Sequence, residues 1–215
     1  MESDYKKDTL KTGTTTVGIV CKDGIVLAAD RRTTAGHQIA NKKTQKVIPI
    51  CDYAAITTAG LVSDAQLFTK LIKAEIKLKE IRVSRSLLLK EVANMLASLS
   101  YSNIRQFSSI PGIVGFLVGG VDNDGFWLYE IGYDGSIQAH DTFTADGSGS
   151  VFALGTLEIL YKKGMTVDEA SKIAVKAVNT AMQHDNASGD GCHVFTITKD
   201  GVKLVIEKQI ESKLE

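Results

Sequence analysis

Asp-Gly pairs between short apolar runs constrain the fold of this chain more than any other feature of its sequence. They are Asp23-Gly24, Asp124-Gly125, Asp134-Gly135 and Asp200-Gly201. Asp-Gly between β-rich runs is a strong hairpin signal, because both residues tolerate the backbone of a tight turn. The flanking runs, among them TTTVGIVC, GIVLAAD, IVGFLVGGV and CHVFTIT, are therefore predicted to be antiparallel strands. KVIPI and YAAITT are predicted to form two more.

Two pairs of helices interrupt the strands. Apolar residues recur at helical spacing over residues 63–82 and again from about residue 86, which predicts the first pair. The second pair begins with a helix over residues 150–163. There Lys162-Lys163-Gly164 is typical of a helix end, with cations in the last turn and a glycine beyond it.

A capping box is predicted to start the fourth helix. Thr166 and Glu169 have the spacing at which each side chain bonds the backbone N–H of the other. The order of elements is then strands, two helices, strands, two helices, strands. This order predicts an α+β fold, in which two antiparallel sheets face each other between two helix pairs, a four-layer αββα sandwich.

Composition narrows the range of functions. The chain has 215 residues, enough for one domain, with 25 Lys+Arg and 25 Asp+Glu, so no net basic charge favours nucleic acid. The sequence has neither an apolar run of membrane-spanning length nor a signal peptide, so we expect a cytoplasmic protein. Cys21, Cys51 and Cys192 are far apart. A disulfide framework and a zinc site are therefore not expected, and we predict no metal or cofactor.

The run Gly13-Thr14-Thr15-Thr16 is the segment that decides the functional interpretation. Taken alone, it is a threonine-rich start of a strand. However, four further motifs follow this run along the chain in a fixed order: AADRRTT, TTAGLVSDAQ, GSGS and DNASGD. Together with TGTTTVGIV, these motifs resemble the archaeal-type proteasome β subunits from about Thr14 to Ile210. That family has the αββα sandwich of N-terminal-nucleophile (Ntn) hydrolases, in agreement with the predicted order of elements.

The resemblance implies a self-processing threonine endopeptidase. Residues 1–13 would be a propeptide, removed by cleavage between Gly13 and Thr14, and residues 14–215 a single protease domain. The Thr14 hydroxyl would be the nucleophile and its new α-amine the general base. A free α-amine has a reference pKa of about 7.7–8.0, so it can accept a proton near neutral pH.

Other site residues follow from the same resemblance. Lys46 matches the active-site lysine and Asp30 the carboxylate that pairs with it, while Gly60 matches the residue whose N–H forms the oxyanion hole. The residues that match those orienting the terminal amine are Ser148, Asp185 and Ser188. Each also has a plain structural interpretation: Lys46 as one of several solvated lysines, Gly60 as a strand end, and the last three as loop residues.

Residues of the specificity pocket are implied as well, namely Thr33, Thr44, Ile48, Thr58 and Val62. This mixed set contains three hydroxyls, which favours an uncharged substrate side chain. Relatives usually have glycine at the position of Asp190. We therefore expect an altered loop there and an additional carboxylate near the site.

The resemblance also implies an assembly, α7β7β7α7, in which heptameric β rings stack between rings of proteasome α subunits. An ATP-dependent unfoldase regulator would supply unfolded protein substrates. A non-catalytic β subunit of the same barrel is the main alternative. The bacterial two-component protease is another, but it has Gly-Asp-Gly-Gln where this chain has Ala29-Asp30-Arg31-Arg32.

Two further alternatives come from single motifs. Gly147-Ser148-Gly149 before a helix could hold a phosphate, although Phe152 stands where GxGxxG needs its last glycine. A cysteine protease could use Cys192 with His193 or His184. Adjacent strand residues point to opposite faces, however, so Cys192 and His193 would not readily meet.

Overall fold

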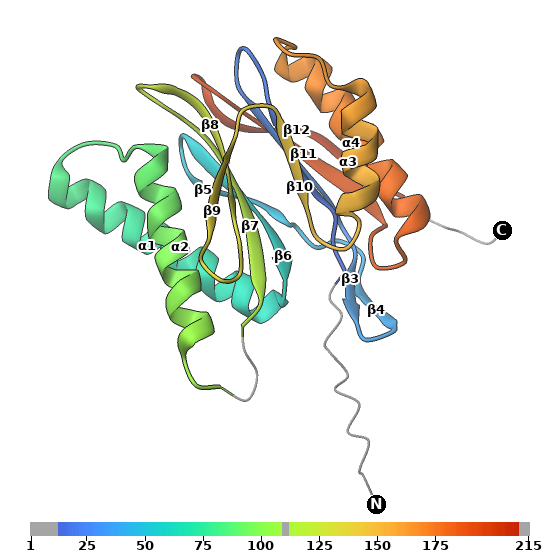
Figure 1. The fold of residues 1–215 in the computed structure, drawn as a ribbon, viewed down its shortest axis with the longest axis horizontal. Helices are drawn as coiled ribbons and strands as arrows, with labels where there is room; N and C mark the ends of the chain where they lie inside the picture. Colours follow the sequence, from blue (N-terminus) through green and yellow to red (C-terminus); the bar gives the residue numbers. More distant parts are fainter. Residues whose placement is uncertain (1–12, 109–111, 211–215) are drawn as a thin grey trace, which may run out of the picture.

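The computed structural model describes residues 13–108 and 112–210. Residues 1–12 of the predicted propeptide lie outside the described residues. Figure 1 shows two sheets side by side, with one helix pair on the outer face of each.

The first sheet has five antiparallel strands in the order β10-β1-β2-β11-β12. Its strands are β1 (Thr16–Val20), β2 (Ile25–Asp30), β10 (Phe143–Asp146), β11 (Gly191–Thr198) and β12 (Gly201–Gln209). β2 lies at its centre and is buried along its whole length. Its side chains alternate between the two faces, so both faces of this sheet are covered.

The second sheet is also antiparallel, with the order β5-β6-β7-β8-β9. Its strands are β5 (Val47–Cys51), β6 (Ala54–Gly60), β7 (Val114–Asp122), β8 (Gly125–Ile131) and β9 (Ile137–His140). A small separate hairpin of β3 (Thr33–Ala35) and β4 (Gln38–Asn41) extends from the edge of the sandwich. The sequence patterns did not predict this hairpin, because its strands are too short to show a period.

The Asp-Gly pairs lie at hairpins, as predicted. They join β1 to β2, β7 to β8, β8 to β9 and β11 to β12. Gly125, Gly135 and Gly201 have φ angles of 140°, 85° and 101°. Residues with a Cβ rarely adopt these values, which explains why glycine follows the aspartate at these turns.

The helices are α1 (Val62–Val83), α2 (Leu89–Arg105), α3 (Ser150–Leu160) and α4 (Val167–His184). α2 begins three residues later than predicted: Leu88 is the residue before its first turn, and its amide donates to the Glu91 carboxylate at 2.9 Å. The capping box of α4 is confirmed: the Thr166 hydroxyl accepts from the Glu169 amide at 3.3 Å, and the Glu169 carboxylate accepts from the Thr166 amide at 2.8 Å.

The predicted end of the third helix is wrong. α3 ends at Leu160, and Tyr161 turns into an extended conformation with φ −66° and ψ 138°. Its ring packs edge-on against Phe143 with the centroids 5.1 Å apart. This contact ends the helix early, so Lys162-Lys163-Gly164 forms the turn after it.

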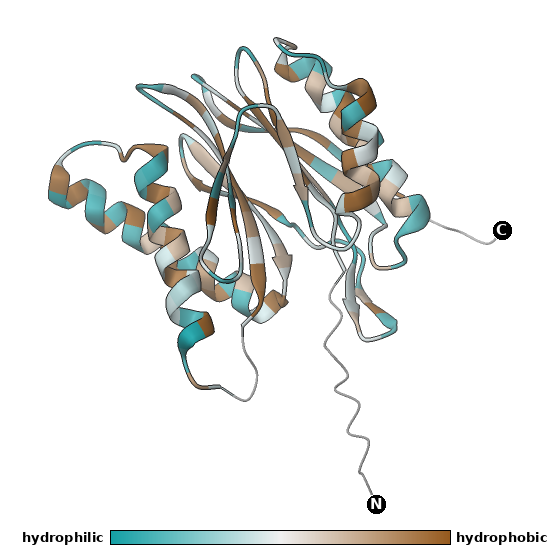
Figure 2. Ribbon diagram, in the orientation of Figure 1, coloured by the Kyte–Doolittle hydropathy of each residue, from teal (hydrophilic) through white to brown (hydrophobic). Residues whose placement is uncertain are grey.

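Three apolar clusters correspond to the spaces between the four layers. One joins α1 and α2 to the outer face of the second sheet, and another joins α3 and α4 to the outer face of the first. The third lies between the sheets and includes Leu27, Leu117, Leu128 and Phe195. Figure 2 shows the apolar residues gathered along these inner surfaces. The predicted αββα sandwich is therefore confirmed.

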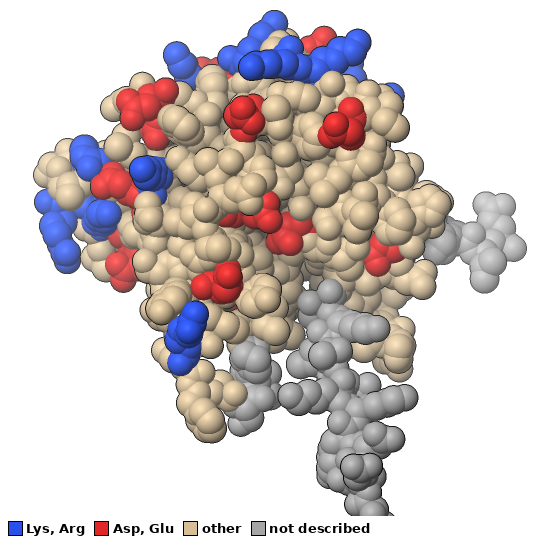
Figure 3. Space-filling view, in the orientation of Figure 1, with Lys and Arg blue, Asp and Glu red and all other residues tan. Residues whose placement is uncertain are grey.

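Most charged side chains lie on the outside of the molecule, whereas Asp30, Arg31 and Lys46 are buried. On the face in Figure 3, Lys and Arg gather at the upper edge and beside acidic residues over α1 and α2, while Asp and Glu lie across the middle. Among the described residues, no helix has the length and apolar character needed to span a membrane.

Candidate active site

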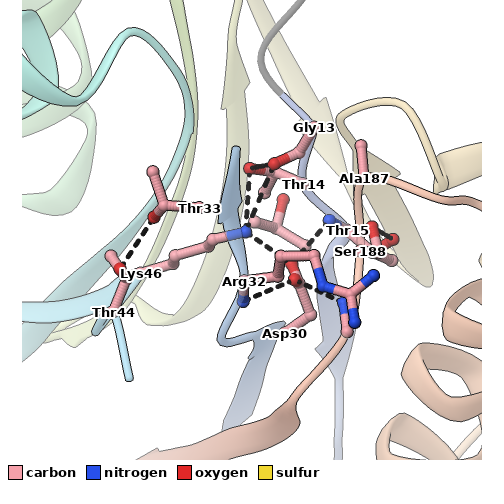
Figure 4. A network of polar contacts seen from close by, with 12 residues as sticks. Gly13, Thr14, Thr15, Asp30, Arg32, Thr33, Thr44, Lys46, Ala187 and Ser188 are labelled. Carbon is pink, nitrogen blue, oxygen red and sulfur yellow. Dashed lines mark hydrogen bonds and ion pairs between the residues drawn. The ribbon is translucent and has the colours of Figure 1, made fainter. Parts of the chain in front are cut away.

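One end of the sandwich brings together the start of β1 and the end of β2. Thr16 pairs with Ala29 in the hairpin register, so Thr14 and Thr15 lie beside Asp30. The Asp30 amide donates to the Thr15 carbonyl at 3.1 Å. From the second sheet, Lys46 at the start of β5 reaches the same point (Figure 4). The site therefore needs both sheets in their native arrangement.

Lys46 connects the Thr14 hydroxyl to Asp30. Its Nζ lies 3.0 Å from Thr14 Oγ1, 2.7 Å from Asp30 Oδ1 and 3.4 Å from the Gly13 carbonyl oxygen. An ammonium has three N–H donors, so these contacts use all of them. Both members of the ion pair are buried, with Lys46 4% and Asp30 0% exposed.

Asp30 also holds the backbone around it. Oδ1 accepts the Thr15 amide at 2.9 Å in addition to Lys46, while Oδ2 accepts the amides of Arg32 and Gly189 at 3.0 Å each. These four donors satisfy the hydrogen-bonding capacity of a fully buried carboxylate. Burial lowers the pKa of Lys46, and the negative charge of Asp30 opposes that shift.

A second set of contacts surrounds the Thr14 nitrogen. It donates to Ser148 Oγ at 3.2 Å, and Ser148 in turn donates to Asp185 Oδ2 at 2.6 Å. Ser188 donates to the same carboxylate oxygen at 2.6 Å. Since its proton is used there, the 2.7 Å contact between Thr15 Oγ1 and Ser188 Oγ has Thr15 as donor. This network connects the Thr14 nitrogen through Ser148 to the Asp185 carboxylate.

Glycines allow the backbone to approach Thr14 closely. Gly147, with φ 95°, lies against the Thr14 carbonyl, and a Cβ there would overlap it. Gly60 has φ 143°, and a Cβ would overlap the Ile113 carbonyl of the neighbouring strand. Neither position can hold another residue without strain.

The bond before Thr14 is intact in this chain. Thr14 Oγ1 donates to the Gly13 carbonyl oxygen at 2.6 Å, and the Thr14 nitrogen is a peptide amide. The hydroxyl therefore lies next to the carbonyl that the predicted self-cleavage would attack.

A small pocket opens beside Thr14, and all five predicted specificity residues line it. Gly13, Lys46 and Gly60 line it too. Thr33 donates to the Thr44 hydroxyl at 2.7 Å, so two of the three threonine hydroxyls bond each other. Four further residues that the sequence motifs did not indicate also line the pocket: Thr34, Gln45, Ala65 and Gln66.

A second pocket lies on the other side of Thr14 and contains two carboxylates that sequence reasoning missed. Glu130 of β8 and Asp146 of β10 line this pocket of about 740 Å³ together with Thr14 and Gly60. Burial raises the pKa of Asp146, and the charge of Glu130 raises it further. The two acids come from different sheets, so no local pattern could have linked them.

The backbone at Asp190 is altered, as expected for an aspartate where relatives usually have glycine. Its φ is 65°, in the left-handed region where glycine is the easiest residue. Its carboxylate pairs with Arg32, with Nε 2.8 Å from Oδ2. The additional carboxylate is therefore engaged with a cation that the sequence analysis did not assign to the site.

The single-motif alternatives gain no support. Cys192 is buried, and burial raises the pKa of its thiol, which disfavours a thiolate nucleophile. Its neighbour His193 bonds Glu207 at 3.2 Å. In the proposed phosphate loop, Ser148 is engaged by Thr14 and Asp185. Within the described ranges, no cluster of three or more His, Cys, Asp or Glu could hold a metal ion.

Two facing antiparallel sheets between helix pairs define the Ntn-hydrolase class of fold. Comparison with known proteins identifies the family within this class. A family model described as "Proteasome subunit" matches residues 10–197. "Proteasome subunit beta" of Methanopyrus kandleri is 42% identical over 208 residues, which cover 96% of this chain and 98% of that protein. The protein of the same description from Archaeoglobus profundus is 43% identical over 208 residues, covering 97% and 95%. This chain therefore belongs to the archaeal-type proteasome β-subunit family.

Proposed function

We propose that this chain is a catalytic β subunit of the 20S proteasome core, a threonine endopeptidase that uses Thr14 after self-cleavage at Gly13. The observation that carries the proposal is the position of Thr14 Oγ1, 3.0 Å from the buried ammonium of Lys46 and 2.6 Å from the Gly13 carbonyl oxygen. A hydroxyl between a cation and a carbonyl is suited to attack that carbonyl.

In the processed enzyme the α-amine of Thr14 takes the proton from Oγ as the oxygen attacks the substrate carbonyl. The Gly60 N–H stabilises the oxyanion that forms. One such donor contributes on the order of 10²–10³ in rate in other acyl-transfer enzymes. Collapse breaks the peptide C–N bond, the ammonium returns its proton to the leaving amine, and an ester joins the acyl group to Thr14. Water, deprotonated by the same amine, then attacks the ester and regenerates the hydroxyl.

Charges around Thr14 suit both forms of its amine. The Lys46 cation favours the neutral amine as base and stabilises negative charge that develops on Oγ. Asp185, which lies one hydroxyl away through Ser148, balances the ammonium formed after proton transfer. Asp30 keeps Lys46 charged and aligned at 2.7 Å.

Self-processing uses the same atoms before any free amine exists. A water would serve as base while Oγ attacks the Gly13 carbonyl carbon, and Gly13 adds no side chain to obstruct the attack. The Gly13 C–Thr14 N bond then breaks, its proton coming from the protonated base, and a second water hydrolyses the resulting ester to release residues 1–13. The Lys46 contact at 3.4 Å to the Gly13 carbonyl oxygen supports stabilisation of negative charge on that oxygen during the attack.

The pocket beside Thr14 is proposed to receive the substrate side chain before the scissile bond. Its wall combines the aliphatic Ile48 and Val62 with threonine hydroxyls, which favours uncharged side chains of moderate size. Membership of the family further supports assembly with α subunits in a cytoplasmic α7β7β7α7 core, fed with unfolded proteins by an ATP-dependent regulator.

The test replaces the proposed nucleophile in reconstituted core particles. Thr14→Ala should abolish turnover of a fluorogenic peptide and leave the full-length chain in an intact-mass measurement. Thr14→Ser should keep measurable activity and cleavage, because it retains a hydroxyl. If assembled Thr14→Ala particles cut the peptide at the wild-type rate, the proposal is wrong.

The alternative, a non-catalytic β subunit, gives a different result. Wild-type particles would then show neither turnover nor a chain that begins at Thr14. The intact triad of Thr14, Lys46 and Asp30 argues against this alternative.

A further inference from the structure

We infer that the ion pair between Arg32 and Asp190 is a positioning pair, which fixes the loop 185–190 against Asp30 and so aligns the Thr14 amine for proton transfer. This inference rests on the proposed function, since it concerns the same threonine. It assigns a role to two side chains outside the proposed catalytic set.

The loop 185–190 carries contacts to both sides of Thr14. Asp185 and Ser188 belong to the network around the Thr14 nitrogen. The Gly189 amide donates to Asp30 Oδ2 at 3.0 Å, and its carbonyl accepts the Arg31 amide at 3.1 Å. A displacement of this loop would therefore disturb the amine and the Lys46–Asp30 pair together.

Arg32 holds this loop at two points. Its Nε and Nη2 lie 2.8 and 3.3 Å from the two oxygens of Asp190, and Nη1 donates to the Asn186 carbonyl at 3.0 Å. Its backbone amide bonds Asp30 Oδ2 at the same time. The guanidinium lies directly over Gly189, where a Cβ would overlap it. One residue thus connects the loop to the carboxylate that aligns Lys46.

The left-handed backbone conformation of Asp190 supports a positioning role for its ion pair with Arg32. A left-handed backbone is unfavourable for a residue with a Cβ, although less so for Asp and Asn. The Asp190 side chain is only 9% exposed and Arg32 22%, so their two-point pairing is largely shielded from water. A shielded, forked pair can offset the strain, whereas an uncharged residue at this position would lack both the charge and the second acceptor oxygen of the fork.

The inference predicts an effect on kcat rather than KM. No residue of the loop 185–190 lines the pocket beside Thr14. The loop reaches the Thr14 nitrogen through Ser148 and does not line the pocket for the substrate side chain, so its displacement should slow the chemical step and leave binding unchanged.

The pH dependence of the rate supplies a second readout, because Asp190→Asn removes a charge near the site. Arg32 is close enough to influence the site: burial lowers the pKa of Lys46, and the charge of Arg32 lowers it further. The other charged groups around Thr14 are Asp30, Asp185 and Asp190, together with Glu130 and Asp146, which line a pocket with Thr14. Removal of the Asp190 charge leaves Arg32 uncompensated, which disfavours the protonated α-amine. The acid limb of the pH–rate profile should therefore move to lower pH.

The experiment uses processed core particles whose chain is shown by intact mass to begin at Thr14. Asp190→Asn keeps the size and the tolerance for a left-handed backbone but removes the charge. We expect kcat for an uncharged fluorogenic peptide to fall roughly tenfold, KM to stay within about twofold, and the acid limb to shift downward. Asp190→Gly relieves the strain yet lacks the charge, so it should lose as much activity.

Glu91→Gln is the matched control. It weakens another Arg–carboxylate pair, in which Arg85 Nη1 lies 2.8 Å from Glu91, between α1 and α2 and away from the site. It should lower the Tm of the particle without changing kcat. Wild-type kcat and pH profile in Asp190→Asn or Asp190→Gly would overturn the inference, as would an equal loss of kcat in Glu91→Gln. Failure of the proposed function is distinguishable, because it would appear as turnover in Thr14→Ala.

Discussion

At the residue scale, the site depends on a buried charge pair whose members come from different sheets. Lys46 is 4% exposed and Asp30 0%. An unpaired charge at such a buried position would be strongly unfavourable. Their partners explain how both remain charged: the carboxylate has four donors, and the ammonium has three acceptors. Each is therefore sensitive to loss of the other.

Replacement of Lys46 tests its role against that of the lysines beside it. Lys46→Ala should lower kcat/KM about a hundredfold or more, because the cation next to Thr14 Oγ is lost. Lys43→Ala is the control, since Lys43 is exposed on the same segment, and it should leave the rate unchanged. Both rates are measured with the fluorogenic peptide on assembled particles. Equal rates in the two variants would mean that Lys46 has no catalytic role.

The alkaline limb of the pH–rate profile should also report Lys46. Burial lowers the pKa of its ammonium below the ordinary 10.5. The proton is then lost earlier as the pH rises, so the activity that needs the cation should fall at a pH below that value. The check is kcat/KM measured over the alkaline range in the wild-type particle. A rate that persists beyond the ordinary lysine pKa would contradict this.

At the element scale, helix ends place the loops that carry site residues. α4 begins at a capping box and ends at His184; the next residue, Asp185, caps it, with its amide bonded to the Ala181 carbonyl at 2.8 Å. The carboxylate proposed to orient the amine is thus fixed by the last turn of a well-capped helix. α3 similarly begins just after Ser148.

Thr166→Ala should lower the free energy of unfolding by about 1 kcal/mol, because it leaves the Glu169 amide without its cap. Thr180→Ala, which removes a hydroxyl bonded to the Lys176 carbonyl within the same helix, serves as the control and should have a smaller effect. Denaturant unfolding of the two variants measures the difference. An unchanged midpoint in Thr166→Ala would show that the cap contributes nothing.

At the scale of the whole molecule, the packing between the two sheets sets the distance between the site residues that each sheet contributes. Leu117 is fully buried in the cluster between the sheets. Contacts within this cluster keep Lys46 of one sheet opposite Asp30 of the other. Damage to this layer should therefore reduce both stability and activity.

Leu117→Ala should lower the free energy of unfolding by about 2–5 kcal/mol through lost burial and a residual cavity. Leu78→Ala, at a residue 57% exposed on α1, should change it by no more than about 0.5 kcal/mol. Thermal or denaturant unfolding of the full chain distinguishes the two. Similar losses for both would place Leu117 outside the core.

Local signals were sufficient for much of the fold. The Asp-Gly turns predicted the hairpins and Thr166 with Glu169 predicted a helix start, because these patterns act over a few residues. The end of α3 was mispredicted because a tertiary contact, Tyr161 on Phe143, decided it. The short β3–β4 hairpin has no period to detect. The motif order also named the residues around Thr14 through their resemblance to a family.

The sequence by itself determined most of the strands and helices, though not β3, β4, β9 or β10, and it determined that a threonine follows a glycine at the start of the first strand. Only the tertiary structure decided which groups meet. Thr14 contacts Ser148 across 134 positions of sequence, and Arg32 contacts Asp190 across 158. Propensity and turn chemistry are short-range, whereas such contacts arise from the packing of whole sheets. The pairing of Asp190 with Arg32, and the meeting of Glu130 with Asp146, therefore became visible only in the folded chain.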